Sequence, residues 1–119
     1  MLIHLILPLC AALLFSAPAL AQSRLSPADL NGLAPGIYIG TWKGKKQLHL
    51  TLKQDGTISG TVDGKYRAGR WYVSGEKLCI EFTVIVFEKT RCGVIDREGP
   101  WLVGYYSKKG EPRIRLRPG

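Results

Sequence analysis

The feature that most constrains the fold is a strict alternation of apolar and polar residues between tight turns. Leu48, Leu50 and Leu52 alternate with polar residues, a period of two that places them on one face of an extended strand. Residues 54–56 (Gln-Asp-Gly) and 63–64 (Asp-Gly) then carry strong hairpin signals. A helix would spread these leucines around its axis, so we expect antiparallel hairpins.

The same alternation recurs along the chain and predicts about eight short strands. Their spacing of ~8–12 residues, with tight turns, is typical of a small barrel or sandwich. We therefore expect an all-β fold, a small antiparallel up-and-down barrel or sandwich. The expected strands cover residues 37–42, 47–53, 57–62, 66–73, 78–83, 90–96, 101–107 and 113–117.

The N-terminal residues predict a secretory signal peptide. Residues 2–20 contain no Lys, Arg, Asp or Glu, and their apolar core ends at an Ala-Leu-Ala site. The apolar run is too short and too broken by proline to span a bilayer of ~30 Å, so we expect no transmembrane anchor. Cleavage after Ala21 would give a periplasmic or secreted protein.

Two further segments follow the expected signal peptide of residues 1–21. Residues 22–35 form an N-terminal arm with a short helix, since Ser26, Pro27 and Asp29 suit an N-cap, a first helical position and an acidic first turn. Residues 36–119 form the β-barrel domain. We expect the mature protein to be a monomer.

Two cysteines, Cys79 and Cys92, remain in the expected mature chain. In an exported protein such a pair predicts a disulfide, and closing a loop of ~14 residues would contribute roughly 3 kcal/mol. A redox or metal role is the alternative, but the spacing is not Cys-x-x-Cys.

Basic residues are the main functional signal. The chain has 17 Lys and Arg against 9 Asp and Glu, a net charge of +8, and the signal peptide removes none of these charges. A period of two places the last three arginines on one face, which can follow an anionic partner. The alternative is a solvated face that protects an edge strand. The candidate anion-binding residues are Lys43, Lys45, Lys46, Lys108, Lys109, Arg113, Arg115 and Arg117.

All three tryptophans follow a Gly-x-Trp pattern. Trp42, Trp71 and Trp101 are separated by 29 and 30 residues. Glycine lets a neighbouring backbone approach closely, while the indole supplies a large apolar surface. The tryptophans are therefore candidates for the lining of a ligand cavity or for the core that closes the barrel.

Sites for catalysis or metal binding are not recognisable in the sequence. After cleavage the one histidine is His49, without a His-Glu-x-x-His or Cys-x-x-Cys pattern, so we expect no metal and no cofactor. No serine lies in a Gly-x-Ser-x-Gly elbow, and we expect the protein not to be an enzyme. A pocket that held His49 beside Glu81 or Glu88 would reopen that possibility.

Three resemblances bear on function. The segment 36–62, with Gly40-Thr41-Trp42, resembles the opening hairpin of lipocalin-like and avidin-like barrels. Residues 23–30 resemble the N-terminal arm of periplasmic metalloprotease inhibitors, which enters the protease cleft, although those barrels carry their first cysteine soon after the first tryptophan. The Gly-x-Trp strands and the Leu78-Cys79 strand look most similar to proteobacterial periplasmic domains of unknown function.

These features lead to one main hypothesis and several alternatives. We expect a non-enzymatic binding domain that recognises an acidic polymer or protein of the cell envelope through a basic face, and not nucleic acid. The alternative is an inhibitor of a secreted hydrolase that uses its arm. A small-ligand carrier and an enzyme of unknown type are less favoured.

Overall fold

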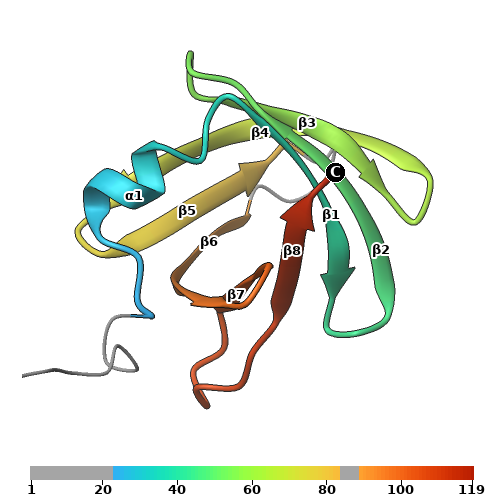
Figure 1. Ribbon diagram of the computed structural model, residues 1–119. Helices are drawn as coiled ribbons and strands as arrows, with labels where there is room; N and C mark the ends of the chain where they lie inside the picture. Colours follow the sequence, from blue (N-terminus) through green and yellow to red (C-terminus); the bar gives the residue numbers. More distant parts are fainter. Residues whose placement is uncertain (1–22, 84–88) are drawn as a thin grey trace, which may run out of the picture.

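The computed structural model describes residues 23–83 and 89–119, and the expected signal peptide lies outside the described residues. Eight antiparallel strands pair in chain order, and β8 returns to β1, so the sheet closes into a barrel (Figure 1). The expected all-β class is confirmed, and of the two architectures the barrel is observed. The strands are β1 (Gly36–Trp42), β2 (Lys46–Leu52), β3 (Thr57–Val62), β4 (Lys65–Ser74), β5 (Lys77–Phe82), β6 (Lys89–Glu98), β7 (Trp101–Tyr105) and β8 (Ile114–Pro118).

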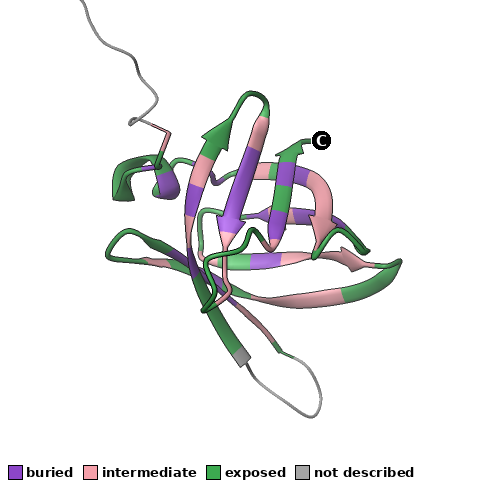
Figure 2. Cartoon of the chain, turned by 90° about the horizontal axis from the view of Figure 1, so that it is seen from below, coloured by how far each residue is buried: buried purple, intermediate pink, exposed green. Residues whose placement is uncertain are grey.

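The period of two seen in the sequence separates the inside of the barrel from its surface. Leu48, Leu50 and Leu52 on β2 are buried, while His49 between them is exposed. Buried and exposed positions alternate along β8 as well (Figure 2). The strand register aligns inward-facing residues on neighbouring strands. Leu52 on β2, for example, pairs with Ile58 on β3, and both side chains are buried.

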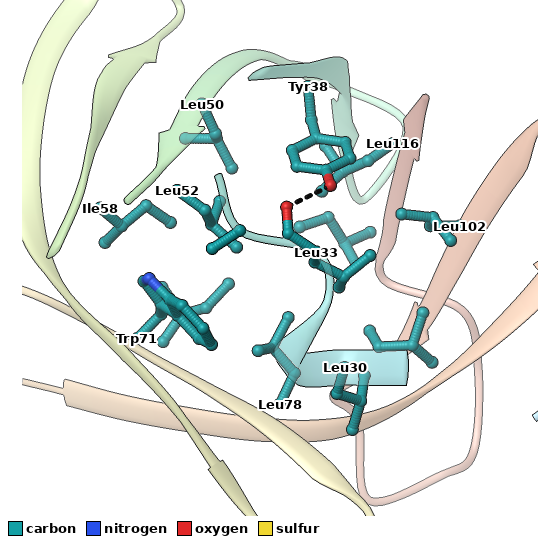
Figure 3. Close-up of a cluster of buried hydrophobic side chains, with 14 of the residues drawn as sticks. Leu30, Leu33, Tyr38, Leu50, Leu52, Ile58, Trp71, Leu78, Leu102 and Leu116 are labelled. Atoms are coloured by element: carbon teal, nitrogen blue, oxygen red, sulfur yellow. Dashed lines mark hydrogen bonds between the residues drawn. The ribbon is translucent and has the colours of Figure 1, made fainter. Parts of the chain in front are cut away.

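The expected short helix, α1 (Pro27–Asn31), closes one end of the barrel. It begins with a capping box, in which the Asp29 N–H donates to Ser26 Oγ (3.1 Å) and the Ser26 N–H donates to Asp29 Oδ2 (3.2 Å). Leu30 is completely buried and belongs to the same apolar cluster as Leu78 (Figure 3). This end of the barrel is therefore filled.

The arm before α1 also packs against the barrel. The Leu25 N–H donates to the Ile95 carbonyl (2.9 Å), and the Arg97 N–H donates to the Ser23 carbonyl (2.7 Å). Arg24 forms an ion pair with Asp96 at 2.7 Å. Residues 23–25 thus add a short extended segment along β6 instead of projecting into solvent.

Most strand ends differ from the expected ones by one or two residues, and those beside the connection between β7 and β8 affect the site. β7 ends at Tyr105, so Tyr106 and Ser107 lie outside it, and β8 begins at Ile114 instead of Arg113. Pro112 has no N–H to continue a ladder before Arg113. The Tyr106 side chain packs against the core, and its hydroxyl donates to the Leu78 carbonyl (3.0 Å), which draws the chain away from the line of β7.

The predicted disulfide is present. Cys79 on β5 and Cys92 on β6 are direct partners in the register, with a Cα–Cα distance of 4.0 Å, and their sulfur atoms are bonded. Cys79 is completely buried, whereas Cys92 is exposed. The bridge therefore ties together two neighbouring strands in the wall of the barrel.

Candidate ligand-binding site

The end of the barrel opposite α1 contains an open cavity of about 320 Å³. Its walls come from the strand ends next to the turns that follow β1, β3 and β7, and from the middle of β2 and β5. Most of the lining is aliphatic or aromatic. The lining residues are Trp42, Lys46, Leu48, Leu50, Val62, Arg67, Ile80, Phe82, Arg91, Tyr106 and Ile114.

Tyr106 lies between this cavity and the filled half of the barrel. Its ring packs close to Gly93 and Gly104, where an added Cβ would approach the ring carbons within 2.9 Å and 2.6 Å. Burial raises the pKa of the Tyr106 hydroxyl far above its ordinary value, so the group stays neutral and donates to the Leu78 carbonyl. Two glycines therefore make room for the ring that limits the depth of the cavity.

Three cationic side chains share the lining with the apolar groups: Lys46, Arg67 and Arg91. The Arg91 guanidinium lies 5.3 Å from the centre of the Trp42 ring, which in turn packs against Tyr106 with ring centres 5.8 Å apart. Arg67 is half-buried, and its Nη1–H donates to the Tyr66 carbonyl (2.9 Å). A cation–π contact of this kind orients a guanidinium without neutralising its charge.

Carboxylates do not offset these cations within the described part of the chain. Both ion pairs found there, Arg24–Asp96 and Arg70–Glu81, lie away from the cavity, and no Asp or Glu lines it. The site therefore combines apolar walls with uncompensated positive charge, which suits a ligand with an apolar body and an acidic group.

Six of the eight predicted anion-binding residues lie in or next to the turns at the open end of the barrel, and we call these six the basic rim; Lys46 among them lines the cavity. Lys43 and Lys45 lie in the turn after β1, and Arg113 directly precedes β8. The pKa of Lys43 is lowered, first by the positive charge of Arg113, then by burial, and further by Arg91 and the neighbouring lysines. The basic rim consists of Lys43, Lys45, Lys46, Lys108, Lys109 and Arg113.

The other two predicted residues, Arg115 and Arg117, form a separate group on the outer wall. Their guanidinium carbons lie 4.7 Å and 5.8 Å from the centre of the Trp101 ring. Arg113 lies one residue before β8, where its carbonyl accepts a hydrogen bond from the Lys43 N–H (2.6 Å), and its charge acts on Lys43 at the rim.

The three tryptophans occupy three different environments. Trp42 lines the cavity, and Trp71 belongs to the core, where its Nε1–H donates to the Lys53 carbonyl (2.8 Å). Trp101 lies in neither place, which contradicts the expectation for this residue. Its register partner Glu98 is exposed, so the side chain of Trp101 is on the outer face of β7, beneath Arg115.

The residues considered for catalysis do not meet in the cavity. His49 is exposed on the outer face of β2, and Glu81 lies on the outer face of β5. Hydrogen bonds from Thr90 (2.7 Å) and then Arg70 (3.3 Å) lower the pKa of Glu81, so its carboxylate is held in a surface network. Glu88 lies outside the described residues. The described chain contains no group of three or more potential metal-ligating side chains.

Sequence reasoning named two of the eleven lining residues, Trp42 and Lys46, as candidate site residues, and it missed both arginines of the site, Arg67 and Arg91. The sequence carried a signal for these two arginines. Arg67 lies four positions before Trp71, and Arg91 lies four positions before Ile95, so each arginine is on the same side of its strand as a core residue. A cation at an inward position of a strand is costly unless it reaches an open end. That pattern could have placed both arginines at the mouth.

No protein-family model, curated protein or solved structure matches this chain. Among the residues described, no helix has the length and apolar character needed to cross a membrane. The geometry of the site is therefore the basis for assigning a function.

Proposed function

We propose that this protein is an exported, non-enzymatic binding domain that takes an anionic amphiphile into the open end of its barrel. The observation that carries the proposal is the cavity of about 320 Å³, in which apolar walls meet Lys46, Arg67 and Arg91. Apolar surface provides affinity, while the cations select an acidic group and place it at the mouth.

The size of the cavity limits the apolar part of the ligand. Sites for small molecules have volumes of ~300–1,000 Å³, so a cavity of about 320 Å³ fits a ligand with a small apolar part. We infer that the ligand is a single-chain acid of this size or a compact ring compound, with its carboxylate or phosphate near Arg67 and Arg91.

The wider hypothesis of an acidic partner in the cell envelope agrees with this ligand class. The signal-peptide pattern of residues 1–21 and the bonded pair Cys79–Cys92 both favour a periplasmic or secreted location. Burial of Leu25, Leu30 and Leu33 in the core favours a binding domain over a hydrolase inhibitor, because an arm packed in this way offers less chain to a protease cleft.

Titration of tryptophan fluorescence with decanoate and with decanol tests the proposal, since Trp42 lines the cavity. We expect decanoate to bind at least tenfold more tightly than decanol. In Arg67→Gln/Arg91→Gln, decanoate should lose about tenfold or more in affinity, because charge-assisted hydrogen bonds contribute about 1.5–3 kcal/mol.

Arg115→Gln/Arg117→Gln is the matched control, because it removes the same charge from the outer wall. Its affinity for decanoate should equal that of the wild type. Equal weakening in both variants, or equal binding of decanoate and decanol, would contradict a site between Arg67 and Arg91.

Val62→Phe should obstruct the cavity and lower the affinity for both decanoate and decanol. Unchanged binding in this variant would place the ligand elsewhere.

A further inference from the structure

Charge is distributed unevenly between the two ends of the barrel. Among the described side chains, the open end carries nine cations, namely the basic rim together with Lys65, Arg67 and Arg91, against two carboxylates, Asp63 and Glu111. The remaining described surface carries seven cations and six carboxylates. The excess positive charge is therefore concentrated around the mouth of the cavity.

The cations of the basic rim lie in or next to two turns at the same end of the barrel. The turns that follow β1, β3 and β7 all lie at the open end, because successive strands of the barrel alternate in direction. Lys45, Lys108 and Lys109 are exposed in two of these turns. A linear polymer would instead contact a row of cations along a groove or a strand. Arg115 and Arg117 on β8 form such a row, whereas the basic rim does not.

The opposite end is too far away to oppose this attraction. The strands contain 5–10 residues, so at about 3.3 Å per residue they separate the two ends by roughly 17–33 Å. The Debye length is about 10 Å at 0.1 M salt, so the carboxylates near α1 are largely screened from a surface at the mouth.

We propose that the open end docks on an anionic lipid surface, with the cavity facing the bilayer. The membrane is the partner that charge complementarity favours, because the cations surround an apolar cavity and a lipid surface offers acidic headgroups above apolar chains. Docking would place the mouth where an amphiphile leaves the bilayer. This last step rests on the proposed function, whereas docking itself does not require a ligand in the cavity.

Co-sedimentation with vesicles tests docking. The mature protein, exported and processed from the full-length chain, is mixed with vesicles of phosphatidylcholine containing 30% phosphatidylglycerol, or of phosphatidylcholine alone. We expect binding to the anionic vesicles only, with a loss at high salt. Lys45→Gln/Lys108→Gln/Lys109→Gln should weaken it at least tenfold, since each lysine near such a surface contributes about fivefold.

Lys53→Gln/Lys77→Gln/Arg97→Gln is the matched control, because it removes three charges from exposed residues towards the α1 end. All variants share one N-terminus, so the comparison isolates the side chains. Docking is supported if the control binds like the wild type. An equal loss in both variants, or no binding to anionic vesicles, would overturn it.

Two further outcomes separate docking from ligand uptake and from a soluble partner. Val62→Phe obstructs the cavity and removes no charge, so it should lose decanoate but keep its vesicle binding, and either function can fail alone. If the protein ignores vesicles but is retained on heparin through Lys45, Lys108 and Lys109, the rim binds a soluble polyanion and membrane docking is wrong.

Discussion

At the scale of single residues, Tyr106 decides how much of the barrel stays open. Its ring occupies the space left by Gly93 and Gly104, and its hydroxyl reaches the Leu78 carbonyl on β5. The side chain therefore links the segment after β7 to β5, across β6, and limits the depth of the cavity. A buried hydroxyl in this position must stay protonated, since a phenolate there would lose both its hydration and its hydrogen bond.

Tyr106→Phe should change how stability depends on alkaline pH. The pKa of Tyr106 is raised in the folded protein above its ordinary value of 10.0, so above about pH 10 the unfolded chain releases a proton that the folded chain retains. Wild-type stability should therefore fall as pH rises above 10. In Tyr106→Phe the fall should be shallower, whereas stability at pH 7 should be lower by about 1 kcal/mol.

Urea unfolding at pH 7 and at several values above pH 10 measures both effects. Tyr66→Phe is the control, because it removes the same hydroxyl group from a side chain that is 68% exposed. A pH slope in Tyr106→Phe equal to that of the wild type would show that this hydroxyl ionises as easily in the folded protein as in the unfolded chain.

At the scale of elements, the arm and α1 give the barrel its two different ends. Leu25, Leu30 and Leu33 extend the core beyond the strands at one end, and no corresponding segment of the described chain covers the other. The capping box explains how a helix of only five residues stays formed, because Ser26 and Asp29 satisfy backbone groups reciprocally.

Leu30→Ala should destabilise the protein without affecting the cavity. Leu30 is completely buried, and large-to-small changes of this kind cost about 2–5 kcal/mol. The cavity lies at the opposite end, so decanoate affinity under native conditions should stay within about twofold of the wild type. Urea unfolding and fluorescence titration on the same variant measure the two quantities.

Asn31→Ala provides the control, because Asn31 is exposed and its side chain makes one hydrogen bond, from Nδ2–H to the Pro27 carbonyl. It should cost less than about 1 kcal/mol. If Leu30→Ala lowers the free energy of decanoate binding by as much as it lowers the free energy of unfolding, the two ends of the barrel are coupled and do not act independently.

The elements could be predicted from the sequence far better than the site. The period of two and the Asp-Gly turn at 63–64 depend on neighbouring residues, and such local signals predicted all eight strands. The helix was predicted from another local signal, the N-cap pattern of Ser26, Pro27 and Asp29. The cavity depends on which apolar side chains fill the barrel. Trp71 and Trp101 share the Gly-x-Trp pattern, yet one is in the core and the other outside, because the parity of each strand relative to its partners decides the face.

At the scale of the whole molecule, the uneven charge should govern how fast an anionic ligand arrives. A net charge of +8 that is concentrated around one opening attracts anions towards that opening before any contact forms. Arg115 and Arg117 on the outer wall, and the nearly balanced charges near α1, contribute less to the attraction at the opening. Steering of this kind acts on association and is screened by salt, whereas contacts inside the cavity act on dissociation.

Stopped-flow measurement of Trp42 quenching by decanoate should separate these effects. Between about 20 mM and 500 mM NaCl, the association rate constant should fall severalfold, while the dissociation rate constant changes little. Lys45→Gln/Lys108→Gln/Lys109→Gln should lose much of this salt dependence, and Lys53→Gln/Lys77→Gln/Arg97→Gln should retain it. If salt changed only dissociation, the rim would act through direct contact with the bound acid, and the concentration of charge at one end would have no steering role.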